Sequence, residues 1–396
     1  MDPILNPYSP GAGMPPPELA GREDLLDRVR ISLERVRMRR PAKSILVVGL
    51  RGVGKTVLLL RSSDYAESRG MLVTRFEAPE SRSLPALLTP GLRTAMIRLA
   101  RRSRARELAR RALRGLAGFA GALKVKYQDI ELGLDLDPEP GLADNGDLEL
   151  DLQALLEAVG EACLSAETGL AMFIDELQYV TEGELAALIV ALHRAAQRRL
   201  PVTLVGAGLP QLRGRMGQAK SYAERLFDFP EVGPLPPAAA SLAITKPAQE
   251  LGVEFKGDAV EMILHEAEGY PYFLQEWGKH VWDAAQRSPI TAEDVRSASA
   301  TALATLDEGF FMVRFDRLTR TERRYLRAMA ELGAGPHRSG EIAGELGRPV
   351  TSLAPVRSKL IAKGMVWSPA HGDTGFTVPR FDGFMRRIMP GDRWRT

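Results

Sequence analysis

The chain has 396 residues, of which 45% are hydrophobic and 26% are charged, and its formal net charge is +3. This length and composition fit a soluble globular protein of two or three domains, and so small a net charge argues only weakly for an acidic partner. The single cysteine, Cys163, excludes a disulfide framework and a cysteine metal cluster within one chain. Five scattered histidines lack the ligand spacing of a zinc site.

The first elements along the chain alternate between helix and strand. Residues 1–20 are rich in proline and glycine, so we expect an extended segment, followed by a helix over residues 22–38. Apolar or alternating runs predict strands at Ser44–Gly49, Gly70–Pro79, Gly169–Leu177, Leu200–Gly208 and Arg225–Leu235. Helical patterns separate most of them, which predicts an α/β fold with a doubly wound parallel sheet.

One segment interrupts this alternation. Arg93–Arg114 reads as a single helix dense in arginine, and Leu123–Asp137 largely alternates apolar and polar residues, as a half-exposed strand or hairpin does. We interpret residues 91–147 as an insertion on the α/β core. The arginines are expected to pair with the acidic stretch Asp135–Asp151; the alternative is contact with a nucleic-acid backbone.

A glycine-rich turn follows the first strand. "GLRGVGKT", Gly49–Thr56, matches the G-x-x-x-x-G-K-[ST] pattern in full, between an apolar strand and a leucine-rich helix. Glycines let backbone N–H groups curl around a phosphate, and the helix N-terminus adds a favourable dipole. The pattern predicts that Lys55 reaches the β and γ phosphates and that the Thr56 hydroxyl ligates Mg²⁺. The predicted nucleotide contacts are Gly49, Gly52, Val53, Gly54, Lys55, Thr56 and Val57.

Two adjacent acids end another apolar strand. In "AMFIDE", Ala171–Glu176, four apolar residues lead to Asp175 and Glu176. Asp175 is predicted to hold Mg²⁺ and Glu176 to orient the attacking water, since two buried acids are costly without a cation. Together the two motifs predict a site for Mg²⁺ and ATP or GTP.

At this point the sequence resembles a known group, the P-loop ATPases of the AAA+ and STAND type, close to archaeal and bacterial ATPases related to origin-recognition initiators. The resemblance is carried by the two motifs above together with "PPELAGRE" (Pro16–Glu23), "SYAERLFDFPEVGPL" (Ser221–Leu235), "GYPYFLQ" (Gly269–Gln275) and a C-terminal winged-helix pattern. It implies a helical lid after the sheet and ATP/ADP in preference to GTP. It also implies that Gly21 and Arg22 lie near the adenine, that Pro271 touches the base or ribose, and that Arg225 reaches a γ-phosphate in cis or from a neighbouring subunit. A surface ion pair is the alternative for Arg225.

The sequence departs from that group at two sensor positions. The fourth strand is followed by "VGAGLPQ", where Gln211 is the nearest polar candidate, and the lid helix near Tyr272 offers only Lys279 in place of an arginine. We therefore expect slow hydrolysis and a switch-like cycle.

The C-terminal region reads as a winged helix–turn–helix. Thr319 or Thr321 caps a first helix, Arg338–Gly347 is a second, Val350–Gly364 a third, and Met365–Val378 forms two strands with a glycine-bearing tip. In a duplex complex the third helix would enter a major groove, and the candidate DNA contacts are Arg348, Ser352, Arg357, Lys359, His371 and Arg380. A module that binds protein or packs on the ATPase is the alternative.

These patterns predict four parts: an N-terminal segment (1–20), an ATPase core (21–233), a helical lid (234–315) and a winged-helix domain (316–396). The predicted function is an ATP-dependent switch that reports its nucleotide state to DNA or protein. The alternatives are an initiator- or transposition-like ATPase that assembles on DNA, with an ATP-dependent homo-oligomer, and a signalling scaffold with little turnover. The N-terminus has no secretory pattern and no apolar run approaches the ~18 residues of a membrane span, so we expect a cytoplasmic protein.

Overall fold

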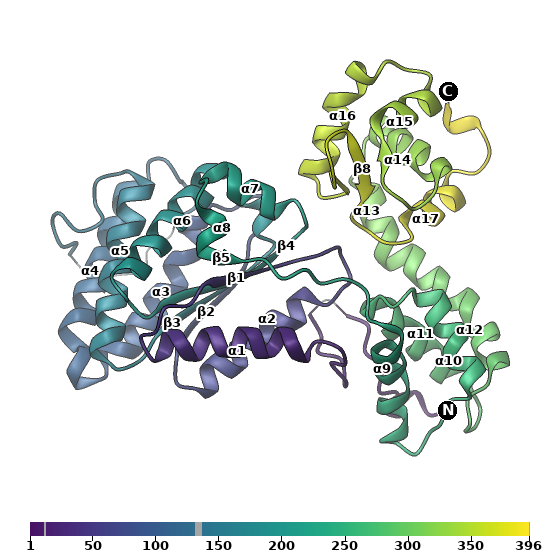
Figure 1. Ribbon diagram of the computed structural model, residues 1–396, viewed down its shortest axis with the longest axis horizontal. Helices are drawn as coiled ribbons and strands as arrows, with labels where there is room; N and C mark the ends of the chain where they lie inside the picture. The colour runs from purple at the N-terminus through teal and green to yellow at the C-terminus, as the bar shows by residue number, and fades with distance from the viewer. Residues whose placement is uncertain (12, 131–136, 396) are drawn as a thin grey trace.

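A computed structural model describes residues 1–11, 13–130 and 137–395. Figure 1 shows three parts: an α/β core, a bundle of helices joined to it by an extended segment, and a C-terminal unit that lies above the bundle. Among the described residues, no helix is both long enough and apolar enough to cross a membrane.

The core is built on a parallel sheet of five strands. The strands are β1 (Ser44–Val48), β2 (Leu72–Glu77), β3 (Leu170–Asp175), β4 (Val202–Gly208) and β5 (Phe227–Asp228). Their order in the sheet is β2-β3-β4-β1-β5, and all pairs are parallel. The prediction of a doubly wound parallel sheet is confirmed, and each strand lies within its predicted range.

Helices cover both faces of this sheet. In chain order they are α1 (Glu23–Arg37), α2 (Lys55–Ser68), α3 (Leu84–Ala100), α4 (Arg106–Leu123), α5 (Leu148–Ser165), α6 (Glu182–Gln197), α7 (Leu212–Ala219) and α8 (Ala223–Leu226). Successive residues of β1 point to opposite faces, as strand geometry requires. Ile45 and Val47 pack with α1 and α2, whereas Leu46 and Val48 pack in the larger cluster with α3–α6.

The structure of the predicted insertion, residues 91–147, differs from the elements predicted there. Arg93–Arg114 is two helices: α3 ends at Ala100, a 3₁₀ turn spans Ser103–Ala105, and α4 begins at Arg106. The strand or hairpin predicted over Leu123–Asp137 is wrong for its first part, because α4 ends at Leu123 and residues 124–130 form turns. Residues 131–136 lie outside the described residues. Ile130, Leu142 and Ala143 are buried in the cluster that contains α4 and α5, whereas Val125 is exposed. Cys163 is a fully buried core residue, as expected.

The helical bundle and the C-terminal unit share one apolar core. The bundle consists of α9 (Pro237–Gln249), α10 (Gly257–Ala267), α11 (Pro271–Ala284) and α12 (Ala292–Thr305). A π-helical turn (Leu306–Phe311) and α13 (Met312–Asp316) continue α12 into the C-terminal unit, which we define as residues 316–395 (Figure 1). Stacked and edge-on rings of Phe273, Phe310, Phe311 and Phe384 link the two parts. The helix predicted from Thr291 to about Phe311 thus runs on to Asp316.

The C-terminal unit combines helices with a small sheet. Its elements are α14 (Arg320–Leu332), β6 (His337–Arg338), α15 (Ser339–Leu346), α16 (Val350–Ala362), β7 (Val366–Trp367), β8 (Asp373–Phe376) and α17 (Phe381–Ile388). The strand order is β6-β8-β7, and both pairings are antiparallel. Thr319 caps α14 through a capping box with Glu322, and Gly347 ends α15 with a φ of +60°. Both ends lie where the sequence predicted them.

Candidate nucleotide site

The glycine-rich turn joins β1 to α2 with the backbone that the motif requires. Gly52 and Gly54 have φ values of +80° and +91°, which residues with a side chain rarely adopt. At Gly49 the requirement is space, because a Cβ atom there would lie 2.1 Å from the Val232 carbonyl oxygen. α2 begins at Lys55, so its first free N–H groups lie directly after the turn.

Lys55 lies inside this turn. Its Nζ donates hydrogen bonds to the carbonyl oxygens of Gly49, at 3.0 Å, and Leu50, at 2.8 Å. The side chain is buried, and burial lowers the pKa of Lys55 to about 8. The ammonium group is thus bound by neutral carbonyls, and a phosphate that enters the turn would supply the missing negative charge.

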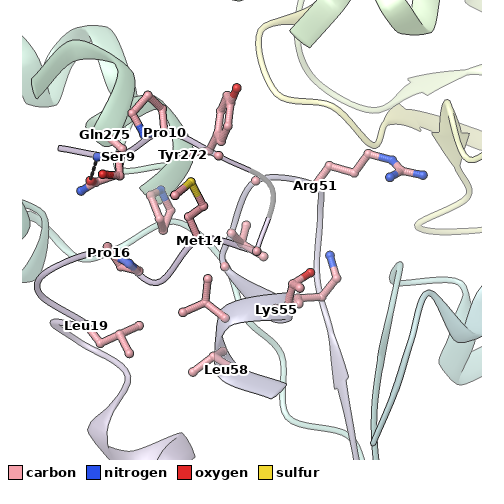
Figure 2. Close-up of a pocket in the computed structure, with 18 of the residues that line it drawn as sticks. Ser9, Pro10, Met14, Pro16, Leu19, Arg51, Lys55, Leu58, Tyr272 and Gln275 are labelled. Carbon is pink, nitrogen blue, oxygen red and sulfur yellow. Dashed lines mark hydrogen bonds between the residues drawn. The ribbon is translucent and has the colours of Figure 1, made fainter. Parts of the chain in front are cut away.

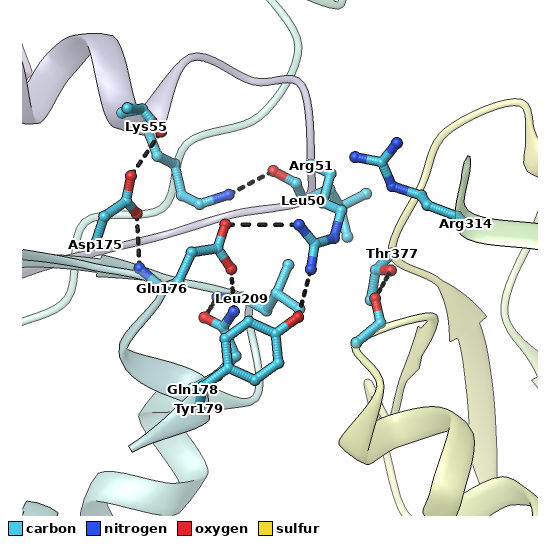
Figure 3. Close-up of polar contacts among 12 residues, drawn as sticks. Leu50, Arg51, Lys55, Asp175, Glu176, Gln178, Tyr179, Leu209, Arg314 and Thr377 are labelled. Carbon is cyan, nitrogen blue, oxygen red and sulfur yellow. Dashed lines mark hydrogen bonds and ion pairs between the residues drawn. The ribbon is translucent and has the colours of Figure 1, made fainter. Parts of the chain in front are cut away.

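Thr56 and Asp175 meet where the magnesium site is predicted. The Thr56 hydroxyl donates to Asp175 Oδ2 at 2.6 Å, and the Glu176 N–H donates to Asp175 Oδ1 at 2.8 Å (Figure 3). Burial and the nearby Glu176 raise the pKa of Asp175, and burial together with Glu176 and Asp175 raises the pKa of Glu77. Mg²⁺ prefers hard oxygen ligands, which the Thr56 hydroxyl and the Asp175 carboxylate supply, so these residues suit the ion that the motif implies.

A cavity of about 490 Å³ opens around the turn (Figure 2). Of the predicted site residues, those that line it are Arg22, Gly52, Val53, Gly54, Lys55, Thr56, Val57, Asp175, Glu176 and Pro271. Gly21 and Gly49 lie just behind this wall, packed against Ala239 and Val232. The structure therefore brings together residues that are up to 249 positions apart in the sequence, from Arg22 to Pro271.

The N-terminal segment also lines the cavity, which the sequence did not predict. Ser9, Pro10, Gly13, Met14 and Pro16 form much of one wall (Figure 2). A Cβ atom on Gly13 would lie 3.3 Å from the Thr56 methyl group, so the segment passes directly over the start of α2.

Tyr8 fixes this segment to the α9–α12 bundle. Its ring is buried flat against Gly278 and near Trp282, and its hydroxyl donates to the Ile244 carbonyl. The Ser9 N–H donates to Gln275 Oε1 at 3.2 Å. The proline-rich composition predicted extended chain, but nothing in it indicated where the chain would lie.

Arg51, a variable position of the motif, is a second residue that sequence reasoning missed. Its guanidinium donates to the Tyr179 hydroxyl at 2.8 Å and lies 3.6 Å from Glu176 Oε1 (Figure 3). Gln178 Nε2 donates to the other carboxylate oxygen of Glu176. Both oxygens of the predicted water-orienting residue are thus engaged by protein groups in this conformation.

The C-terminal unit contacts the same residue. The Arg51 N–H donates to the Thr377 carbonyl oxygen at 3.0 Å. A Cβ atom on Gly364 would lie 3.1 Å from an Arg51 guanidinium nitrogen and 3.1 Å from the Tyr179 hydroxyl oxygen, so only glycine fits there without displacement. The glycine-rich turn is therefore part of the interface between core and C-terminal unit.

Arg314 of α13 brings a fourth cation to the cavity, beside Arg22, Arg51 and Lys55. Its guanidinium lies 4.1 Å from the Phe310 ring and donates to the Phe310 carbonyl, and it makes no ion pair with a described residue. Burial and the neighbouring Arg51 lower the pKa of Arg314 to about 10. Arg51 has one carboxylate partner, Glu176, and Arg314 has none among the described residues. Two arginines that share one carboxylate beside a phosphate site are suited to bind an anion.

Three predicted residues lie elsewhere. Arg225 is exposed on α8 and does not line the cavity, so the interpretation in which it acts in cis is not supported by this conformation. Gln211 and Lys279 also lie outside the cavity wall, whereas Arg314 lines it.

Two candidate DNA contacts in the C-terminal unit are occupied by internal bonds. Arg357 donates to Thr374 and Ser368 and to the Asp373 carbonyl, so it holds the β7–β8 hairpin. Arg380 pairs with Glu266 of the bundle. These two stay predictions, in which the side chain would have to exchange an internal partner for DNA, whereas Arg348, Ser352, Lys359 and His371 are exposed.

The parallel sheet, the glycine-rich turn and the Thr56–Asp175 pair define a P-loop nucleotide-binding core. Residues 18–205 match the AAA ATPase domain family. Residues 308–385 match a domain of unknown function (DUF8462). No curated protein sequence is significantly similar to the chain.

Solved structures are similar over nearly the whole chain at low sequence identity. A Walker-type ATPase of Pyrococcus abyssi is 18% identical with a TM-score of 0.57, over 93% of this chain and 96% of that one. The Orc1 protein of Aeropyrum pernix, solved in complex with DNA, is 18% identical with a TM-score of 0.47, over 94% of each chain. The RuvB Holliday junction branch migration motor of Thermotoga maritima is 18% identical with a TM-score of 0.45, over 94% and 95%. Only the first of these scores exceeds 0.5, and it supports the P-loop ATPase fold.

Proposed function

We propose that this chain is a slowly hydrolysing ATP switch whose C-terminal unit reports the nucleotide state. The match to the AAA ATPase domain family establishes the coarser statement, an ATP-binding ATPase. The proposal adds the slow rate, the switch and the reporting role.

The proposed reaction is the attack of water on the γ-phosphorus of ATP, which breaks the β–γ bond and releases ADP and phosphate. Lys55 neutralises charge on the β and γ phosphates, Thr56 and Asp175 hold Mg²⁺, and Glu176 orients the water. When bound, the ion neutralises charge that develops on the phosphate oxygens. Arg314 is a further candidate for phosphate contact, because it lines the cavity without an ion-pair partner among the described residues.

One observation carries the switch proposal: Arg51 lies in the glycine-rich turn and contacts both Glu176 and the C-terminal unit. A phosphate bound in the turn changes the surroundings of Arg51, and with them the contact to Thr377 and Gly364. The engagement of both Glu176 oxygens supports slow turnover, since a carboxylate that accepts from Gln178 and is ion-paired with Arg51 is poorly placed to accept from water.

The arrangement of three helices and a three-stranded sheet supports the interpretation of residues 316–396 as a winged helix. These residues contain 15 lysines and arginines against 8 aspartates and glutamates, a net charge of +7 in a chain whose total is +3. So basic a unit, with Arg348 and Lys359 exposed near α16, favours duplex DNA over protein as the partner it reports to.

Two substitutions test the site. Lys55→Ala is expected to lose nucleotide binding in a titration, while Lys256→Ala, an exposed lysine of the bundle, binds as the wild type does. Glu176→Gln is expected to bind ATP and retain it without hydrolysis. Unaltered affinity in the first variant, or normal phosphate release in the second, would refute the assigned roles.

Two alternative functions would each give a distinct experimental result. ADP that copurifies with a protein incapable of turnover would favour a nucleotide-locked signalling scaffold. ATPase activity stimulated by duplex DNA, with a mass that increases to a homo-oligomer in ATP, would favour an initiator- or transposition-like ATPase that assembles on DNA. In that assembly Arg225, which is exposed, would reach the γ-phosphate of a neighbouring subunit.

A further inference from the structure

Eight exposed arginines lie at the edge of the core opposite the nucleotide cavity. Parallel strands start at one edge of the sheet and end at the other, and the cavity lies at their ends. The loops and helix ends at the starting edge carry Arg39, Arg40, Arg101, Arg102, Arg104, Arg106, Arg198 and Arg199, which we call the arginine edge. In Figure 1 this is the region of α3–α5, away from the C-terminal unit.

The end of α5 contacts both the turn after α1 and the turn after α3. The Arg39 guanidinium donates to the Leu164 carbonyl oxygen at 3.3 Å, and the Ser165 hydroxyl donates to the Arg104 carbonyl oxygen at 2.8 Å. Arg104 also lies 3.2 Å from Glu167. The turn after α1 and the turn between α3 and α4, which are more than 60 residues apart in sequence, therefore form one surface.

Most of this positive charge has no partner within the protein. Arg40, Arg101, Arg102, Arg106 and Arg199 make no side-chain hydrogen bond or ion pair with a described residue. The ion pairing expected for the arginine-rich segment is confirmed further along α4, where Arg111 and Arg114 both bind Glu139, at 2.9 Å each. The prediction is wrong for the turn itself.

The preference of helix C-termini for cations explains only some of the arginines at this edge. Helix C-termini favour a cation by about 0.3–1 kcal/mol, and α1, α3, α5 and α6 all end at this edge. That effect explains an arginine at each end, but not four arginines within the six residues from Arg101 to Arg106. Arg39 and Arg199 moreover have φ values of +59° and +54°, at helix ends where glycine is the usual residue.

We propose that the arginine edge binds the phosphate backbone of duplex nucleic acid without sequence preference. Guanidinium groups match phosphate oxygens in a fork of two hydrogen bonds, and all eight cations of the arginine edge are arginines. Two of them are paired with acids: Arg104 with Glu167, and Arg198 with Glu157 and Glu161. Four strand starts about 4.8 Å apart span roughly 15 Å, a length over which duplex DNA carries about nine phosphate charges.

The same surface is poorly suited to a membrane. Met38, which is 57% exposed, is the one exposed large apolar side chain that the described residues place in these loops. Surfaces that lie on bilayers add an apolar face to their positive charge, and this one has none. The proposal stands independently of the C-terminal unit, which lies at the other side of the core.

The test measures binding of the full chain to a fluorescein-labelled 30-bp duplex of arbitrary sequence, by anisotropy over a range of salt concentrations. Arg101→Gln combined with Arg102→Gln removes two charges from the edge. Arg61→Gln with Arg287→Gln is the matched control, because both are exposed arginines elsewhere. Arg348→Gln with Lys359→Gln removes two charges from the C-terminal unit.

Loss of two phosphate contacts is expected to make the slope of log Kobs against log salt shallower by about 1.8 and to weaken binding about sixtyfold at 0.1 M salt. The control double variant should match the wild type. Wild-type binding in the edge variant, with loss only in the Arg348/Lys359 variant, would overturn the arginine edge and leave the proposed function standing. Binding of the wild type to phosphatidylserine vesicles and not to the duplex would overturn it in favour of a membrane.

Discussion

Arg51→Met is the substitution that separates a switch from a simple ATPase. Arg51 holds Glu176 by an ion pair and Tyr179 by a hydrogen bond, while its backbone joins the C-terminal unit. Methionine retains the packing of the side chain and removes the charge. We expect the variant to release Glu176 and therefore to hydrolyse ATP faster than the wild type in the absence of any partner.

The magnitude follows from the geometry. Two unit charges 3.6 Å apart attract by about 4–5 kcal/mol at an effective dielectric constant of about 20. Both side chains are less than one-fifth exposed, so desolvation, together with repulsion between Arg51 and Arg314, offsets much of this attraction. A net contribution of about 2 kcal/mol, less than half of the Coulomb attraction, corresponds to about a thirtyfold rise in the rate.

The assay is steady-state phosphate release at saturating Mg·ATP, with nucleotide affinity measured in parallel. Tyr179→Phe is the graded control: it removes one hydrogen bond of Arg51 and keeps the ion pair, so about a fivefold rise is expected. A rate for Arg51→Met equal to or below that of the wild type, at unchanged affinity, would refute the claim that Arg51 restrains Glu176.

Three other substitutions test the walls of the site. Tyr8→Ala should lower the free energy of unfolding by about 3–5 kcal/mol in a denaturant titration and weaken ATP binding, whereas Tyr8→Phe retains the buried ring and should cost about 1 kcal/mol. Gly49→Ala should abolish ATP binding in a calorimetric titration, because its Cβ atom would meet the Val232 carbonyl; wild-type affinity would contradict the tight approach. Asp175→Asn should bind ATP but need a higher Mg²⁺ concentration for half-maximal turnover; an unshifted magnesium dependence would remove Asp175 from the ion's ligands.

The sequence predicted the fold and the centre of the site because both are encoded locally. Apolar runs specify the strands, and "GLRGVGKT" combines a turn, a helix start and its ligands within eight residues. Asp175 was predictable from its place at the end of a buried strand, since the ends of parallel strands meet at one edge of the sheet.

What the sequence could not predict depends on contacts between distant segments. Residues 8–16 have no periodic pattern, and the place of Gly13 over α2 depends on Tyr8 filling a gap beside Gly278. Arg51 occupies a position that the motif leaves variable, and its partner Thr377 is more than 300 residues away. The α3–α4 break was missed because arginine and alanine favour helix throughout Arg93–Arg114, so no glycine or proline marked the turn.

The position of Arg51 gives the proposed switch a reciprocal property. ATP binds in the turn that contains Arg51, and the C-terminal unit docks on the same residue through Thr377 and Gly364. If ATP weakens that docking and so raises a partner's affinity for the C-terminal unit by some factor, then that partner must raise ATP affinity by the same factor, because the coupling free energy belongs to both sites. Arg51→Met keeps the backbone hydrogen bond to Thr377 but removes the guanidinium that packs at Gly364 and pairs with Glu176, so the same duplex DNA should alter ATP affinity less in this variant than in the wild type. Equal effects of DNA in both proteins would show that the coupling passes through another contact. The first such contact to test is the Arg380–Glu266 ion pair between the C-terminal unit and the bundle.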